Sequence, residues 1–340
     1  MKVGIIGFGV VGKKRYASIL ENTSYTVDAI SENNSLARKD IPENIEIFED
    51  YQLLIDSAKV DIVFISLPNK FAAEATALSL KKGLHVFCEK PPAKTLAELN
   101  AVKAISEMFP DLKLMYGFNH RFHNSVEEAK SIIQNNTLGN LINMRGVYGK
   151  SQMISFNQDD WRTRREDSGG GILLDQGIHM LDLIRYLSGE SFTQIFSFID
   201  NAFWNFDVED NAYVLMKSSR GIVAQLHSSA TQWRHLFNLE ITMEKGSLVL
   251  GGILTGSKSY GEETLTIITA DPTNDRGAPH EATSKFNKDV SWDNEIKYFA
   301  DCLANNSAIK RGSIDDAIET MKLIEAIYKA DPIWKKKYYT

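Results

Sequence analysis

A charged pair, Glu89 and Lys90, follows an apolar run in the stretch FCEKPPAKT and is itself followed by Pro91 and Pro92. Two adjacent prolines end a strand because they donate no backbone hydrogen bond to a sheet, and Pro91 favours an extended conformation at Lys90. A lysine held at a strand end can stabilise negative charge that develops on a substrate oxygen. A solvated ion pair is the alternative interpretation of Glu89 and Lys90.

A second group of ionisable residues lies in the stretch GGGILLDQGIHMLD. Asp175 and His179 are four residues apart and Asp182 is three further on, so a helix places all three on one face. Histidine has an unperturbed pKa of about 6.5 and can take a proton near neutral pH. The glycines at 169–171 would begin this helix with little steric bulk, which would let a substrate approach. A buried structural histidine and a surface or orienting aspartate are the alternatives.

The N-terminal stretch KVGIIGFGVVG contains Gly7, Gly9 and Gly12 between a strand pattern and a helix pattern. This is the context that a dinucleotide-binding loop requires. Gly7 would make the tight turn, Gly9 would admit a pyrophosphate, and Gly12 would let the helix pack closely on the strand. A glycine-rich turn without a ligand is the alternative. The predicted cofactor-binding residues of this loop are Gly7, Phe8, Gly9, Val10, Val11 and Gly12.

The end of the next strand pattern, TVDAISEN, is expected to contact the ribose of the cofactor. Ser31 occupies the end position and Glu32 follows it. The Glu32 carboxylate can accept hydrogen bonds from ribose hydroxyls, and its charge would repel the 2′-phosphate of NADP. We therefore expect NAD, with NADP as the alternative because Arg38 and Lys39 are nearby in the sequence.

The first 120 residues alternate short apolar runs with helical patterns, which predicts a doubly wound parallel sheet with helices on both faces. The predicted strands are 2–7, 26–31, 61–68, 85–89 and 113–119, and the predicted helices are 9–22, 49–58, 71–83 and 95–109. Carboxyl ends of parallel strands border the ligand crevice. We therefore expect Pro68 and Asn69, together with Glu89 and Lys90, to contact the cofactor. An ordinary helix N-cap is the alternative for Asn69.

The pattern changes near Asn119 and predicts a second, α+β domain with an open, mostly antiparallel sheet. The predicted strands are 141–149, 192–200, 212–219, 222–230, 236–244 and 247–252, with helices at 125–135 and 172–189. Residues 255–290 are polar and predicted to be rich in loops. Helices at 293–306 and 313–331 follow. We expect one domain over 1–120 and a substrate-binding and oligomerisation domain over 121–312.

Composition limits the class of protein. A length of 340 residues agrees with two domains, and a formal net charge of −6 argues against a nucleic-acid partner. Cys88 and Cys302 provide neither a disulfide framework nor a metal-ligand cluster, and the seven histidines show no ligand spacing, so no metal is expected. The cysteine content suits a reducing compartment, and no run approaches the roughly 18 apolar residues of a membrane span. We therefore expect a cytoplasmic protein that does not bind a membrane.

Taken together, these segments resemble the Gfo/Idh/MocA oxidoreductase family. The matching segments are 7–12, Pro68-Asn69, Glu89-Lys90-Pro91, and the glycines at 169–171 leading to Asp175, His179 and Asp182. The resemblance implies a Rossmann domain followed by an α/β domain whose open sheet builds a homodimer or homotetramer, with the helix at 313–331 packed back on the Rossmann domain. It also implies that Lys90, Asp175 and His179 are catalytic and that the proline after the lysine is cis.

The resemblance does not decide whether Lys90 or His179 takes the proton from the substrate hydroxyl. Two positions also depart from the family pattern. Ala72 stands where many members carry a histidine after the Pro-Asn pair, so one cofactor or packing contact of those members is absent. Ser31 stands where an acidic residue is common, which weakens the expectation of NAD.

The stretch WRTRRED places Arg162, Arg164 and Arg165 just before the glycine run. Guanidinium groups suit phosphate or carboxylate ligands, and a solvated loop is the alternative. Tyr148 and Trp161 are candidate pocket aromatics or core residues. The stretches TQWRHLFNLEI and DVSW are similar to a bacterial subgroup associated with surface-polysaccharide and nucleotide-sugar pathways.

We therefore expect hydride transfer between a nicotinamide cofactor and the secondary alcohol or ketone of a sugar or sugar nucleotide. The expected substrate-binding residues are Lys90, Tyr148, Trp161, Arg162, Arg164, Asp175 and His179. One alternative is a cyclitol dehydrogenase of the myo-inositol type, whose neutral substrate does not need the arginines. The other is a non-catalytic NAD(P)-binding regulatory protein, which would not need all three predicted catalytic residues.

Overall fold

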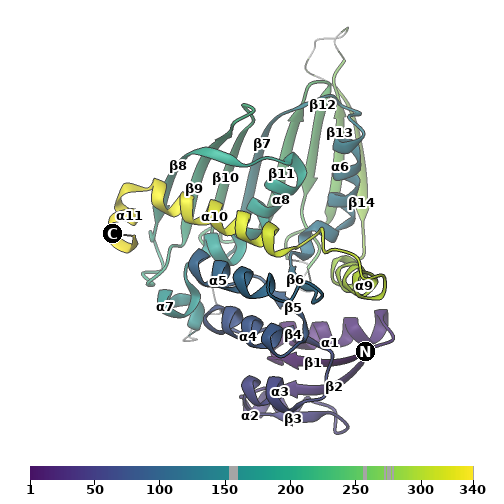
Figure 1. The fold of residues 1–340 in the computed structure, drawn as a ribbon. Coiled ribbons are helices and arrows are strands. Elements are labelled where there is room, and N and C mark those ends of the chain that lie inside the picture. The colour runs from purple at the N-terminus through teal and green to yellow at the C-terminus, as the bar shows by residue number, and fades with distance from the viewer. Residues whose placement is uncertain (153–159, 256–258, 272, 274–276, 278, 340) are drawn as a thin grey trace. The chain divides into compact units, whose positions relative to one another are not determined.

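The computed structural model describes residues 1–152, 160–255, 259–271, 273, 277 and 279–339. The chain divides into two compact units. The first comprises Met1–Asn119, Glu166–Gly169 and Trp292–Ile318, and the second comprises His120–Arg165, Gly170–Ser291 and Glu319–Thr340. Each unit contains one sheet of its own (Figure 1).

Six parallel strands form the sheet described in the first unit, in the order β3-β2-β1-β4-β5-β6. The strands are β1 (Lys2–Ile6), β2 (Thr26–Ser31), β3 (Glu46–Phe48), β4 (Ile62–Ile65), β5 (His85–Glu89) and β6 (Leu114–Gly117). The helices between them are α1 (Val10–Asn22), α2 (Ser35–Arg38), α3 (Tyr51–Ser57), α4 (Asn69–Lys81) and α5 (Leu96–Ser106). Every residue of β4 is buried, as expected for a parallel strand that is covered on both faces. The predicted doubly wound parallel sheet is confirmed.

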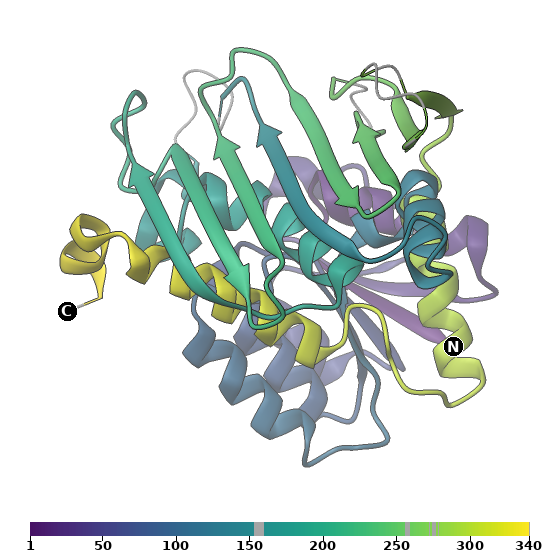
Figure 2. The same ribbon diagram turned by 90° about the horizontal axis from the view of Figure 1, so that it is seen from above.

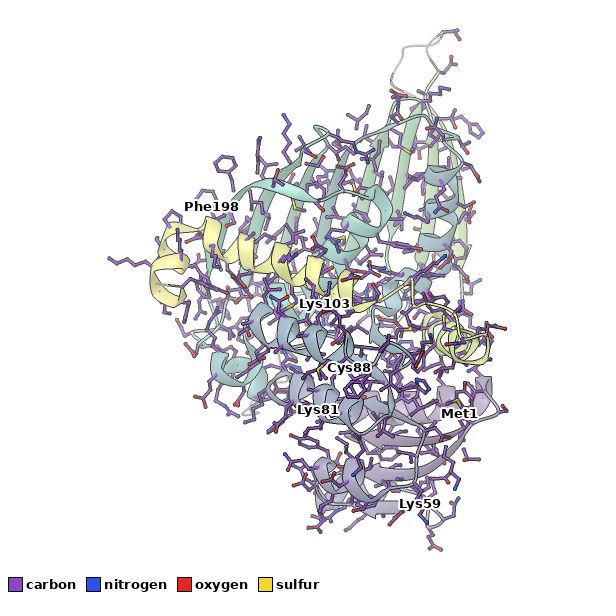
Figure 3. All side chains as sticks on the ribbon, viewed as in Figure 1. Met1, Lys59, Lys81, Cys88, Lys103 and Phe198 are labelled. Carbon is purple, nitrogen blue, oxygen red and sulfur yellow. The ribbon has the colours of Figure 1, made fainter. Side chains whose placement is uncertain are left out.

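Aromatic packing joins helix α9 (Ser291–Ala304) to this sheet. The Phe64 and Phe87 rings stack with centroids 5.1 Å apart, and the Phe299 ring meets them edge-on at 6.0 and 5.6 Å. Cys88, which Figure 3 labels, is buried beside Phe87, and burial raises the pKa of its thiol to about 12. A thiol that stays protonated at neutral pH is a packing group here and not a nucleophile.

The sheet of the second unit has eight described strands in the order β14-β13-β12-β11-β7-β10-β9-β8. They are β7 (Leu141–Gly149), β8 (Phe192–Asp200), β9 (Asn211–Ser218), β10 (Val223–Ser229), β11 (Leu236–Met243), β12 (Gly246–Gly251), β13 (Glu263–Thr269) and β14 (His280–Phe286). Neighbouring strands run antiparallel except β7 and β10, which pair in parallel. Along β9 and β11 every second residue is buried, the alternation expected when helices cover only one face. The predicted mostly antiparallel sheet is confirmed.

Helices α6 (Asn124–Gln134), α8 (Ile178–Ser188) and part of α10 (Ile314–Ala330) lie behind this sheet in Figure 2, and no described helix of the second unit covers the face toward the viewer. Strands β8 and β9 carry an apolar strip that consists of Phe196, Phe198, Tyr213 and Leu215. Their side chains are between 48 % and 76 % exposed. They share one face because Phe196 is paired with Leu215 and Phe198 with Tyr213.

The expectation of loops over 255–290 is wrong for β13 and β14, which form a hairpin at the edge of the second sheet. The sequence of β14, HEATSKF, lacks apolar alternation because most of its residues are exposed, so periodicity alone could not identify it. Several short elements were also not predicted. These are α2, β3, the 3-10 helices η1 (Asn119–Phe122) and η2 (Trp161–Thr163), α7 (Arg165–Ser168) and α11 (Pro332–Tyr338).

The residues of helix α10 are divided between the two units. Ile314–Ile318 belongs to the first unit and the rest to the second. In the second unit, Thr320 Oγ1 accepts a hydrogen bond from Arg185 at 2.9 Å. The Ile327 carbonyl accepts one from Ser197 at 2.6 Å. Neither this helix nor any other in the described residues is long and apolar enough to cross a membrane.

Candidate active site

The glycine loop between β1 and α1 has the backbone geometry that its sequence predicts. Gly7 has a φ of +88°, which favours glycine, and its N–H donates to the Ser31 carbonyl at 2.8 Å. A Cβ on Gly12 would lie 2.0 Å from the Gly7 oxygen, so this glycine is needed for close packing. A Cβ on Gly9 would meet nothing within 4 Å, and Val10 is 82 % exposed. The N-terminus of α1 is therefore uncovered within its unit and fits a pyrophosphate.

Glu32 is anchored at the end of β2 by two backbone groups. One of its carboxylate oxygens accepts from Phe8 N–H at 2.7 Å and the other from Asn34 N–H at 2.8 Å. These bonds fix the glycine loop relative to the loop after β2. A carboxylate has about four acceptor positions, so the two bonds leave capacity for ribose hydroxyls.

The residues after β4 hold the short segment Glu166–Gly169, which belongs to the same unit. Asn69 is buried, and its side-chain N–H donates to the Ser168 carbonyl at 2.7 Å. Lys70 forms an ion pair of 2.6 Å with Asp167. The alternative that Asn69 is an N-cap is wrong, because Pro68 occupies the cap position and Asn69 begins helix α4.

Lys90 directly follows β5 and is partly exposed, and the Lys90–Pro91 peptide bond is cis, as the family resemblance implied. Strands β1, β4 and β5 are parallel neighbours. Their carboxyl ends therefore lie at one edge of the sheet, which brings Lys90 to the same edge as the glycine loop and the Pro68-Asn69 pair. Ala72 is buried in α4 and offers no polar side chain there.

A buried arginine that the sequence analysis missed fixes the carboxylate next to Lys90. Arg15 Nε lies 2.6 Å from Glu89 Oε1, and Arg15 Nη2 lies 2.6 Å from Glu295 Oε2. The guanidinium carbon is 4.5 Å from the centre of the Phe87 ring and 4.2 Å from that of Trp292. Burial, only partly offset by Arg15, raises the pKa of Glu295 to about 8. The available signal was an arginine three residues after Gly12 on a predicted helix.

In the second unit, the helix expected over 172–189 begins with π-helical geometry. Segment η3 (Leu173–Gly177) is a π-helix that contains Asp175, and α8 continues from it and contains His179. Buried Glu209, which the sequence analysis missed, accepts hydrogen bonds from Gly171 N–H at 2.8 Å and Leu173 N–H at 3.0 Å. These bonds fix the start of η3. Single π-helical turns occur frequently at functional sites.

The glycine run before η3 packs closely against other parts of the protein. A Cβ on Gly169 would lie 2.4 Å from the Lys94 carbonyl oxygen. A Cβ on Gly170 would lie 2.3 Å from the hydroxyl of Tyr328. A side chain at either position would therefore clash with the protein, so both glycines have a packing role. They admit the neighbouring backbone and side chains that hold this segment.

His179 lies in a buried aromatic group that includes a second histidine. The rings of His120 and His179 are stacked with centroids 3.8 Å apart and an interplanar angle of 15°. The Tyr148 hydroxyl lies 3.0 Å from His120 Nε2. All three side chains are more than nine-tenths buried. The structure thus brings Tyr148 and His179 together. His120 was missed because it lies in η1, a short element with no periodic signal.

Asp175 lies beside a lysine from the end of β7. Lys150 Nζ is 3.5 Å from Asp175 Oδ2, and Gln176 Nε2 is 3.4 Å from the same oxygen. Burial raises the pKa of Tyr148 and Tyr260, and the negative charge of Asp175 adds to this shift in both. Both phenols are therefore neutral hydrogen-bonding groups at physiological pH.

Asp182 is structural. Both of its carboxylate oxygens accept from the buried Arg121 guanidinium, at 2.7 and 2.6 Å. Thr320 Oγ1 lies 3.3 Å from one of them. This fully buried pair fixes α8 against η1 and thereby holds the segments that carry the two stacked histidines.

Arg162 and the aromatic residue before it form a local pair. Arg162 Nη1 lies 3.0 Å from Asp160 Oδ2. Its guanidinium carbon is 4.5 Å from the centre of the partly exposed Trp161 ring. The charge of Arg162 is therefore already balanced by a carboxylate in the same turn.

Arg165 packs against the C-terminal helix and not into an open pocket. Its Nη2 donates to the Tyr339 hydroxyl at 3.2 Å, and its guanidinium carbon lies 4.1 Å from the centre of the Tyr338 ring. Arg164 is exposed. In the described residues, no group of three or more histidine, cysteine, aspartate or glutamate side chains is placed to hold a metal ion.

Comparison with known families matches both units of this chain. Residues 1–117 match the description "Oxidoreductase family, NAD-binding Rossmann fold". Residues 126–249 match the description "GFO/IDH/MocA C-terminal domain".

Individual relatives agree with this assignment. D-Glucoside 3-dehydrogenase of Escherichia coli (strain K12) is 32% identical over 197 residues, which is 56% of this chain and 54%, or about half, of that protein. Myo-inositol 2-dehydrogenase of Thermotoga maritima is 24% identical over 289 residues, 82% of this chain and 80% of that protein. A solved structure of levoglucosan dehydrogenase in complex with NADH has the same fold, with a TM-score of 0.86, 22% identity and coverage of 98% of this chain and 97% of that chain. The chain belongs to the Gfo/Idh/MocA oxidoreductase family.

Proposed function

We propose that this chain is an NAD-dependent dehydrogenase that acts on a secondary alcohol of a sugar, with the reverse reduction of the ketone as the same reaction. The observation that carries the proposal is the edge of the first sheet. There the glycine loop, the Pro68-Asn69 pair and Lys90 follow three neighbouring parallel strands. Such an edge is where a Rossmann sheet binds its dinucleotide.

The residues at this edge fit NAD. The uncovered N-terminus of α1 suits a pyrophosphate, and Gly9 has room for close backbone approach. Glu32 is held where it can accept from ribose hydroxyls, and its charge disfavours a 2′-phosphate. The bound nicotinamide supplies the hydride acceptor or donor, and the chain supplies the groups that bind and orient the substrate and move its proton.

Three side chains are proposed to act on the substrate oxygen and carbon. Lys90 is a cation that stabilises negative charge on the oxygen as its proton leaves. His179 is the group that takes this proton near neutral pH, and Lys90 is the alternative proton acceptor. Asp175, held beside Lys150, orients a sugar hydroxyl. Tyr148 and Trp161 are proposed to line the substrate site.

A neutral sugar is the proposed substrate class, rather than a sugar nucleotide. The arginines were the reason to expect a diphosphate, but Arg162 is paired with Asp160, and Arg165 packs among the rings of the C-terminal helix. Three of the relatives are named for D-glucoside, levoglucosan and myo-inositol, which are neutral, and one is named for glucose 6-phosphate, which is not. A myo-inositol-type cyclitol is the second candidate, since the relative named for it matches 82% of this chain.

We also propose that the chain forms a homodimer or homotetramer through the apolar strip on β8 and β9. A contiguous exposed strip of this kind marks an interaction surface more often than a solvated one. The two buried free cysteines agree with a cytoplasmic location.

The experiment that tests this function measures reduction of NAD and of NADP by absorbance with a panel of substrates. The panel contains methyl glucosides, free hexoses, levoglucosan, myo-inositol and UDP-sugars. We expect turnover with NAD and a neutral sugar or glucoside. Turnover restricted to UDP-sugars would contradict the substrate class, and tight NAD binding without turnover in either direction would favour the regulatory alternative.

A further inference from the structure

The stacked histidine pair in the second unit gives His120 a role that goes beyond the proposed function. A centroid distance of 3.8 Å and an angle of 15° place one imidazole face directly on the other. Rings in this arrangement do not donate hydrogen bonds to each other, because the N–H groups lie in the ring planes. Their contact is therefore one of packing and of charge.

Electrostatic repulsion limits the number of protons that the two imidazole rings can bind. Two imidazolium ions at this separation repel strongly, and burial weakens the solvent screening that would relieve the repulsion. One proton on the pair is tolerated, because the other ring stays neutral. Both rings are more than nine-tenths buried, so a second proton would enter a poorly solvated site.

Two carboxylates near the pair are bound by other side chains. Asp182 on α8 is bound by Arg121, the next residue in η1 after His120. Glu263 at the start of β13 accepts from His123, whose ring meets that of His120 at 5.5 Å.

The remaining facing groups are a phenol pair and a carboxylate that has its own cation. Asp175 in η3 lies beside Lys150 from the end of β7. Tyr148 on β7 and Tyr260 before β13 stay neutral because burial raises the pKa of both phenols. Asp175, Asp182 and Glu263 therefore each have a cationic or imidazole partner, which reduces the negative charge that reaches the two rings.

We propose that His120 is a positioning residue for His179, which fixes the plane of the His179 ring and, by taking the single proton that the pair tolerates, keeps His179 neutral in mild acid. The Tyr148 oxygen lies 3.0 Å from His120 Nε2 and can accept a hydrogen bond from that nitrogen when it carries a proton. This inference rests on the proposed function, in which neutral His179 takes the substrate proton.

The first test compares the pH dependence of kcat/KM in the wild type and in His120→Phe. Phenylalanine keeps a flat ring against His179 but carries no proton. Without the competing charge, His179 becomes protonated at higher pH, so the acid limb of the profile should move upward by about one pH unit or more. If the acid limb of His120→Phe lies at the same pH as that of the wild type, whatever the size of kcat/KM, the proposal is overturned. His120 would then have only a packing role. His280→Gln, an exposed histidine on β14, is the control.

A second measurement does not depend on turnover or on the variant's folding. The ring ¹⁵N resonances of the wild-type protein, without cofactor, are followed from pH 5 to 9, with the pair assigned through its contacts to the Tyr148 ring. We expect His120 and His179 to titrate as a coupled pair in two separated steps. Two independent titrations over the same range would overturn the proposal. Coupled titration in a protein that shows no turnover with any sugar would instead place the failure in the proposed function.

Discussion

Lys90 follows a carboxylate that a buried arginine holds. Arg15 lies between the Phe87 and Trp292 rings and binds both Glu89 and Glu295. Because Glu89 is the last residue of β5, this contact fixes the backbone from which Lys90 extends. A long, flexible lysine side chain is thus attached to a rigid base, which favours a defined position for its charge.

Replacement of Lys90 tests its charge directly. Lys90→Met removes the cation but keeps most of the chain length. We expect kcat to fall by about 100-fold or more, as for loss of one group that stabilises developing charge, while NAD affinity by calorimetry stays near the wild-type value. Lys59→Met, at an exposed position labelled in Figure 3, is the matched control. Full activity in Lys90→Met would remove this residue from the mechanism.

Glu295 predicts how stability depends on pH. Its pKa is raised from 4.5 to about 8 in the folded chain, so the folded state holds a proton that the unfolded state has lost. The free energy of unfolding therefore decreases as pH rises between these values, by at most about 1.4 kcal/mol per pH unit, and the full cost is present above pH 8.

Glu295→Gln cannot lose a proton, so its stability should decline less between pH 6 and pH 9 than that of the wild type. Urea unfolding at several pH values measures this difference. Glu43→Gln, at an exposed position in the same unit, should follow the wild-type curve. Parallel curves for wild type and Glu295→Gln would show that Glu295 stays ionised through this range.

At the scale of elements, two glycines of the loop between β1 and α1 have different roles. Gly12 is needed for packing, and Gly9 is assigned to cofactor binding. Gly12→Ala would place a Cβ 2.0 Å from the Gly7 oxygen, so we expect a loss of about 1–3 kcal/mol in the free energy of unfolding. Gly9→Ala meets nothing within 4 Å and should change stability by less than about 0.5 kcal/mol, while it weakens NAD binding. Thermal unfolding and calorimetry on the two variants distinguish these outcomes. Equal loss of stability in both would contradict the assignment of Gly9 to the cofactor.

Some helices and strands could be predicted from the sequence and others could not. Parallel strands such as β4 are continuous apolar runs, and β9 alternates clearly, so both were identified from periodicity. The edge strand β14 is mostly exposed and has no such pattern. The π-helical start of η3 depends on hydrogen bonds to Glu209, more than 30 residues away along the chain, which no local pattern encodes.

The residues of the candidate site also differ in whether a local sequence pattern identifies them. Lys90, Asp175 and His179 stand in short motifs that can be read locally. Arg15 and His120 acquire their roles from contacts with residues distant in the sequence, Glu295 and His179 respectively. These long-range contacts, and not a local motif, identify Arg15 and His120, and such contacts exist only in the folded chain.

For the whole molecule, the apolar strip on β8 and β9 predicts self-association. Phe198→Glu places a charge among Phe196, Tyr213 and Leu215, and a charge buried without a partner opposes association. We expect the wild type to have the mass of a dimer or tetramer by light scattering and the variant to shift to the monomer. Ile333→Glu, an equally exposed apolar position on α11, is the control. A monomeric wild type would contradict this surface assignment.

The central claim is hydride transfer between NAD and a carbinol carbon of a sugar. The most direct measurement uses the panel substrate with the highest turnover, deuterated at the carbon that is oxidised, and examines the reduced cofactor by mass spectrometry. The account predicts one deuterium in the reduced nicotinamide and a sugar ketone as the product, with both lost in His179→Ala. Reduced cofactor without deuterium, or the absence of reduction with every neutral sugar and cyclitol of the panel, would contradict it.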